Sequence, residues 1–134
     1  MTIIDSLGSV LEGIADLQVR YTDLDKPKKS PCVTITPERL THTPEAMQVD
    51  RVYDYFILEV YMETFKGNVK TDLSTFESLL NTIKNTIYDH RTLDNTAYDC
   101  KVDAGRLVQK KGETNVQFIC QLRLRVLTLL GVNG

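Results

Sequence analysis

Two long stretches of the sequence alternate between side chains that suit a core and side chains that do not. In an extended chain, successive side chains point to opposite faces. In residues 51–63, RVYDYFILEVYME, one face then carries Asp54 with the apolar residues Val52, Phe56, Leu58, Val60 and Met62. Residues 116–126, VQFICQLRLRV, alternate in the same way with hardly a break. Long strands with one apolar face must bury that face against another layer, so the pattern predicts a sheet with a core on one side.

The second face of residues 51–63 is unusual because it is rich in tyrosine. It carries Arg51, Tyr53, Tyr55, Ile57, Glu59 and Tyr61. Three tyrosines and an isoleucine could form an apolar patch of roughly 500 Å² or more, which is at or above the largest patch usual on a soluble monomer. Either an element of the same chain covers this patch, such as a helix or the neighbouring strands, or another chain does. The sequence leaves both alternatives open.

The remaining segments predict a mixed fold. Apolar residues recur at helical spacing in residues 3–14 and indicate an amphipathic helix. Thr2 and Asp5 are placed to form a capping box at its start. Strands are expected at 17–21, 32–36 and 97–102, and a second helix from Asp72 to about residue 90, with Ser74 and Glu77 at its start. Pro37 and Pro44 predict an exposed excursion over 37–49, and QKKGET predicts a turn.

We therefore expect a single α+β domain over residues 1–134. It should contain a mainly antiparallel sheet of about five strands, with two helices packed on one face, in the order α-β-β-β-α-β-β. A chain of 134 residues with 42% hydrophobic and 25% charged residues can bury one such core.

Charge and composition exclude several classes of protein. The net charge of −2 argues against a broad nucleic-acid footprint, which requires a basic surface. No run approaches the roughly 18 apolar residues of a membrane span, and MTIIDSLGSV lacks the basic region of a signal peptide. We expect a cytoplasmic chain without membrane contact. Three cysteines without CxxC spacing, at 32, 100 and 120, are then expected to be buried free thiols.

Catalytic patterns are weak. His42 and His90 have no partner at metal-ligand spacing, and no Ser/His/Asp or Cys/His arrangement is visible. We expect no enzyme activity, no metal and no cofactor. The alternative from this class is a small metal-dependent nuclease or nucleotide-processing enzyme, which would need Asp99 and Asp103 to bind magnesium; the loop pair Asp23 and Asp25 is a further carboxylate candidate.

The order of these segments resembles one protein family over nearly the whole chain. The helix IIDSLGSVLEGI, the strand PCVTIT, the strand RVYDYFILEVYME, the helix LSTFESLLNTIKNTI and the strand NVQFICQLRLRVLTL follow one another as in tail terminator proteins. These are the tail completion, or tail-to-head joining, proteins of long-tailed bacteriophages (siphoviruses). The family is defined by length, element order and patterning, and it has no catalytic motif.

The resemblance implies a structural role at the head–tail interface of a virion assembled in the bacterial cytoplasm. Family members form a ring, usually a hexamer, on the head-proximal end of the tail tube, although they can be monomeric when free. The ring ends tail elongation, docks on the connector and lets DNA pass. The implied partners are other copies of the chain, the tail tube protein and the head-completion protein. A sibling role as the head-completion (stopper) protein remains an alternative.

Candidate contact residues come from the sequence itself. Aromatic residues and arginine are enriched at protein interfaces. We therefore expect a subunit or tube contact at Tyr53, Tyr55, Ile57 and Tyr61, joined by Arg123 and Arg125 if the last strand presents them on the same side. A second contact is predicted for the loops 23–31 and 37–49, which contribute Lys28, Lys29 and Arg39.

Overall fold

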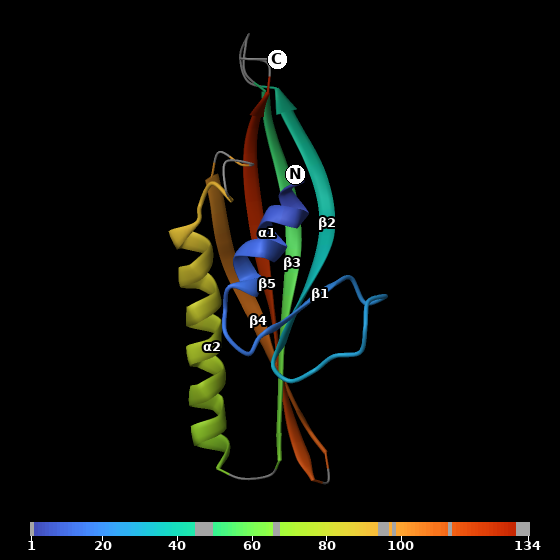
Figure 1. Cartoon of the computed structure of the whole chain (residues 1–134), viewed down its shortest axis with the longest axis vertical. Coiled ribbons are helices and arrows are strands. Elements are labelled where there is room, and N and C mark those ends of the chain that lie inside the picture. Colours follow the sequence, from blue (N-terminus) through green and yellow to red (C-terminus); the bar gives the residue numbers. More distant parts are fainter. Residues whose placement is uncertain are drawn as a thin grey trace.

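The computed structural model describes residues 2–44, 50–65, 68–93, 97, 99–112 and 114–130. Two helices, α1 (Ile3–Glu12) and α2 (Val69–Asp89), accompany the strands β1 (Gln18–Tyr21), β2 (Cys32–Pro44), β3 (Asp50–Phe65), β4 (Asp99–Lys111) and β5 (Asn115–Leu130). The strands form one sheet in the order β1-β2-β3-β5-β4, in which only the β1–β2 pair is parallel. The predicted α+β class and element order are confirmed (Figure 1).

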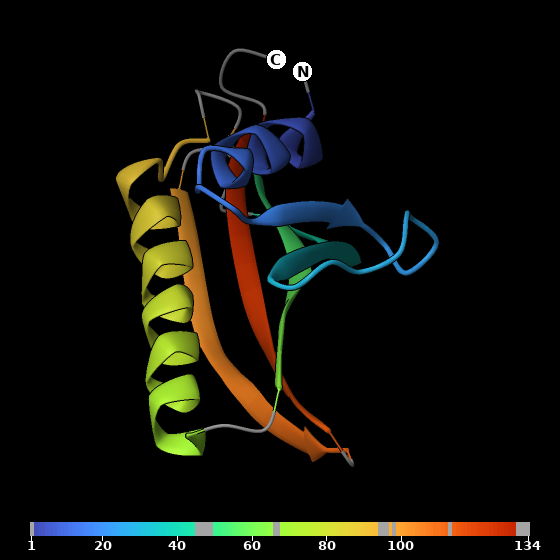
Figure 2. The same cartoon turned by 60° about the horizontal axis from the view of Figure 1, so that its bottom comes forward.

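The core lies between one face of this sheet and the two helices. β3 and β5 pair along their whole lengths and place Leu58 opposite Leu122. From α2, the ring of Phe76 packs 5.6 Å from that of Phe118 on β5. Both helices contribute to this single buried cluster, so they cover the same face of the sheet (Figure 2). The two alternating stretches thus form the centre of the sheet, as their pattern predicts.

The helix starts differ in how well the sequence predicts them. At α1, Thr2 and Asp5 form the expected capping box. The predicted start of α2 at Ser74 is wrong, because Asn68 caps the helix: its Oδ1 accepts a hydrogen bond from the Thr71 backbone at 3.2 Å. The extra first turn contains one apolar residue, the exposed Val69, so periodicity did not reveal it. Among the described residues, no helix is long and apolar enough to cross a bilayer.

The predicted excursion over 37–49 is also wrong. Residues 37–44 continue β2 and pair with β3, with a register shift between Pro37 and Arg39. β1 pairs with β2 only from Cys32 to Ile35. Beyond that point β2 is paired on one side within the described residues, and proline is tolerated on such an edge or at a bulge. Residues 45–49 lie outside the described part of the chain.

β4 is longer than expected because a bulge extends it. The predicted strand 97–102 runs on to Lys111, with a register shift between Asp103 and Arg106. Gly105 lies in this shift, where a Cβ would approach the carbonyl oxygen of Gln121 to 2.5 Å. Such close backbone approach requires glycine. The polar residues after it lie on an edge strand, which explains why they resemble a turn. The predicted turn QKKGET is confirmed only in its second half, between Lys111 and Asn115, where the N–H of Gly112 donates to the carbonyl oxygen of Asn115 at 2.8 Å.

The three cysteines are free and buried, which confirms the prediction for their state. Burial raises the pKa of all three thiols, that of Cys100 to about 12. Because alkylation requires an exposed thiolate, we expect iodoacetamide at pH 8 to modify the native protein only as fast as it unfolds. Denatured protein, as the control, should react completely within minutes. Rapid modification of native Cys100 would contradict this placement.

Asp54 is an acid on the core-facing side of β3, and it is half-buried. Burial raises the pKa of its carboxyl group, because the charged form loses hydration. Folding is therefore penalised above the folded-state pKa, and the penalty vanishes below the unfolded value near pH 4. We expect Asp54→Asn to raise the free energy of unfolding at pH 7 and to lose this advantage at pH 3, as measured by urea denaturation. Equal stability of the two proteins at pH 7 would contradict it.

Candidate interaction surface

The face of the sheet opposite the helices, called the open face here, carries the predicted tyrosine patch. Tyr53, Tyr55, Ile57 and Tyr61 all lie on it and are half-buried. Because both helices pack against the other face (Figure 2), the alternative in which a helix covers the tyrosines is wrong. What shields these rings within the described chain are side chains of neighbouring strands and of one loop.

Arginines of β5 interleave with the tyrosines of β3. In the register, Arg125 lies opposite Tyr55 and Arg123 opposite Ile57. Each guanidinium group contacts the tyrosine two residues along β3 from its register partner: Arg123 lies 4.3 Å from the centre of the Tyr55 ring, and Arg125 lies 5.5 Å from that of Tyr53. Tyr53, Tyr55, Arg123 and Arg125 are called the tyrosine–arginine strip. Stacked cations hold these rings in place, each contact contributing about 0.5–1 kcal/mol at an exposed site.

Glu38 adds an acid to the strip, a role that no sequence pattern predicts. Its Oε2 accepts a hydrogen bond from Nε of Arg123 at 3.1 Å. Glu38 lies between Pro37 and Arg39, where the register of β2 shifts. The shift aims its carboxylate at the open face, and no local pattern reveals where a register will shift. One of the two arginine charges in the strip is therefore balanced by an acid.

Lys28 contacts two side chains of β3, Glu59 and Tyr61, at the end of the open face away from Tyr53. Its Nζ lies 2.7 Å from Oε1 of Glu59 and 5.2 Å from the centre of the Tyr61 ring. Burial acts to raise the pKa of Glu59, but the hydrogen bond and charge of Lys28, together with Gln121 and Arg20, outweigh it, and the pKa lies below its usual value. The predicted Lys28 and Tyr61 are thus brought together.

Lys29 and Arg39, the other two cations predicted at the contact, are placed differently from Lys28. Lys29 is exposed, and its backbone N–H donates to Oε1 of Gln18 at 2.8 Å. Arg39 lies opposite Tyr55 in the register of β2 and β3, while its side chain lies outside the described residues.

The loop 22–31 is folded against the open face and fixed by a buried arginine. Arg20 is only 3% exposed. Its guanidinium group donates to the carbonyl oxygen of Lys26 at 2.6 Å, to Oγ1 of Thr34 at 2.8 Å and to the carbonyl oxygen of Asp25 at 3.4 Å. The Asp25 carboxylate accepts hydrogen bonds from the backbone of Tyr21 and of Lys26, which lower its pKa. The loop is therefore pre-organised, although its composition is that of a mobile one.

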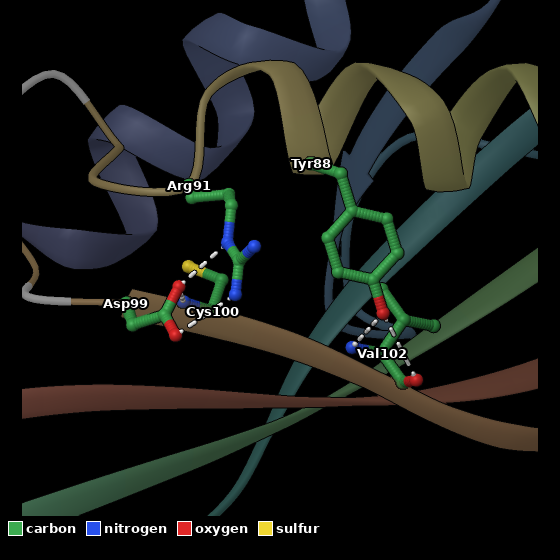
Figure 3. Close-up of polar contacts among 5 residues, drawn as sticks. All are labelled: Tyr88, Arg91, Asp99, Cys100 and Val102. Carbon is green, nitrogen blue, oxygen red and sulfur yellow. Dashed lines mark hydrogen bonds and ion pairs between the residues drawn. The ribbon is translucent and has the colours of Figure 1, made fainter.

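The carboxylates proposed for magnesium are used differently. Asp99 accepts two hydrogen bonds from Arg91, at 2.8 Å and 3.0 Å, and a third from the backbone of Cys100 (Figure 3). The bonds from Arg91 lower the pKa of Asp99. Asp103 lies opposite Arg123. Within the described ranges, no group of three His, Cys, Asp or Glu side chains could hold a metal ion.

The Arg91–Asp99 pair is one of the polar contacts that join the C-terminal end of α2 to the edge strand β4. Beside it, the hydroxyl of Tyr88 accepts from the backbone N–H of Val102 at 3.1 Å and donates to the carbonyl oxygen of Val102 at 3.4 Å (Figure 3). Side chains thereby satisfy backbone groups at the exposed edge of the sheet, a common protection against edge pairing. Asp99 has a structural use here, because it joins the end of α2 to the start of β4.

No protein-family model matches the chain, and no curated protein matches it either.

Proposed function

We propose that the chain is a tail terminator subunit that forms a ring on the head-proximal end of a phage tail tube. The ring ends tail elongation, joins the tail to the head connector and allows DNA to pass. The observation that carries this proposal is the tyrosine–arginine strip on a sheet face that neither helix covers. Tyrosine and arginine are the residues most often found at the energetic centres of protein interfaces.

The energetics of the open face favour a protein partner. Because the three tyrosines and Ile57 of this face are already half-buried, a partner would cover roughly half of the ~500 Å² that fully exposed side chains would offer, which contributes on the order of 5 kcal/mol before association costs are subtracted. The rings are already held by Arg123, Arg125 and Lys28, so little side-chain freedom remains to be lost on binding. A rigid aromatic surface of this kind suits a subunit or tube contact.

The charge of the chain suits passage of DNA without tight binding. Arg123 is paired with Glu38, and Lys28 is paired with Glu59. With a net charge of −2, the chain offers little unbalanced positive charge to phosphate groups. The nuclease alternative is disfavoured by Asp99, whose carboxylate would have to leave Arg91 before it could bind magnesium.

Deleting the gene from the phage that encodes the chain tests the proposal. We expect filled heads and unjoined tails to accumulate, with tails of uncontrolled length, and a plasmid-borne copy should restore infectious virions. Heads that lose their DNA beside tails of normal length would instead identify the stopper protein. Normal virions in the deletant would contradict both assignments.

A further inference from the structure

The loop 22–31 presents a leucine that nothing in the described chain covers. Leu24 is 95% exposed. Its turn is well defined: Thr22 has a positive φ of 57°, its N–H donates to the carbonyl oxygen of Ile35 at 2.9 Å, and its Oγ1 accepts from the N–H of Leu24 at 3.3 Å. Arg20 fixes the following residues from beneath. Because the backbone around it is ordered, this exposed apolar side chain is pre-organised for contact with a partner.

A hollow that fits such a side chain lies between the C-terminal ends of the two helices. It has a volume of about 470 Å³. Val10, Ile14 and Ala15 contribute apolar atoms from the α1 side, and Thr82 and Thr86 line it from α2. The hollow and the Leu24 loop lie on opposite sides of the molecule, with α2 on the left and the loop on the right of Figure 2. One copy therefore cannot fill its own hollow.

The charges around the two features are complementary. On the Leu24 loop the exposed Lys26 and Lys29 outnumber the exposed acid Asp23. At the hollow, Asp16 and Asp89 are exposed and adjacent in sequence to the lining residues Ala15 and His90. Both helices end there without a basic residue in the last turn, so their C-terminal dipoles add negative potential. The nearby cation of Arg91 is bound to Asp99.

We propose that Leu24 of one subunit inserts into the hollow between α1 and α2 of the next copy, with Lys26 and Lys29 facing its acidic rim. Leu24 and the hollow lie on different surfaces of the subunit, so the contact is heterologous. It repeats from copy to copy until a ring closes. This inference rests on the proposed ring and assigns the surfaces that build it. The hollow is thus occupied by another copy of the same chain.

Cross-linking between two singly substituted proteins tests this contact. Leu24→Cys protein is mixed with Thr82→Cys protein and oxidised, both free at high concentration and on tail tube ends, and the linked peptides are mapped by mass spectrometry. Thr75→Cys is the matched control, because Thr75 is also exposed and lies two turns away on α2. The three native thiols are buried and do not interfere. We expect the 24–82 link and little 24–75 link.

The outcomes separate the contact from the proposed function. Absence of the 24–82 link in both free and tube-bound protein overturns the inference even if the protein caps tubes. The link in free protein without tube binding supports the contact and contradicts the terminator role. In addition, Leu24→Asp should weaken self-association on the order of 10- to 100-fold, whereas Phe65→Asp, which also removes an exposed apolar side chain, should not.

Discussion

Replacing Tyr55 with glutamate is expected to leave the domain folded and to abolish its attachment to the tail tube. Tyr55 is half-buried on the open face, away from the helices, so an acidic side chain can reach solvent there. At an interface the same change removes a stacked ring and buries a charge. Central aromatic residues of interfaces typically contribute 2 kcal/mol or more, so affinity should fall at least about 30-fold.

The measurement is binding of the purified variant to tail tubes, beside its thermal unfolding. Tyr55→Phe is the matched control, since it keeps the ring over Arg123 and should bind within a few-fold of the unchanged protein. Thr75→Glu adds an acid on the exposed side of α2 and should also bind. A Tyr55→Glu protein that folds normally and still completes infectious virions would show that the strip is not the contact.

Replacing Arg20 with methionine is expected to cause the largest loss of stability at a polar position. The change leaves the carbonyl oxygens of Lys26 and Asp25 without their donor and removes the anchor of the loop 22–31. Loss of a buried, hydrogen-bonded charge of this kind costs about 3 kcal/mol. For a domain of this size, the midpoint of thermal unfolding should fall by about 10 °C.

Urea denaturation and proteolysis of the loop measure the two consequences separately. Arg20→Lys should recover only part of the stability, because an ammonium group cannot reproduce the planar fork of three donors. Lys29→Met is the control on the same loop, since its side chain is exposed. If Arg20→Met unfolded at the same urea concentration as the unchanged protein, the anchoring role of Arg20 would be wrong.

Elements with strong side-chain periodicity could be predicted from the sequence. The alternation in β3 and β5 and the apolar face of α1 gave their type and their buried sides, because these residues face one core. The errors lie where pairing rather than pattern decides. β2 accepts Pro37 because its outer edge has no partner strand there among the described residues, and β4 continues past Gly105 because a bulge restores its register.

The candidate surface was predicted in part. Period-two spacing was enough to place Tyr53, Tyr55 and Tyr61 on one face, and the register then brought Arg123 and Arg125 beside them. Glu38 could not be predicted, because a register shift directs its side chain. Nor could the exposure of Leu24, which depends on a loop held by the buried Arg20.

Binding of the purified protein to tail tubes that lack it tests the central claim most directly. The tubes are sedimented with increasing amounts of protein, their ends are imaged by negative-stain electron microscopy, and the bound copies are counted. The terminator proposal predicts a cap at one end of each tube that saturates at a single ring of subunits. Binding along the whole tube, or no binding to tubes beside binding to DNA-filled heads, would contradict it.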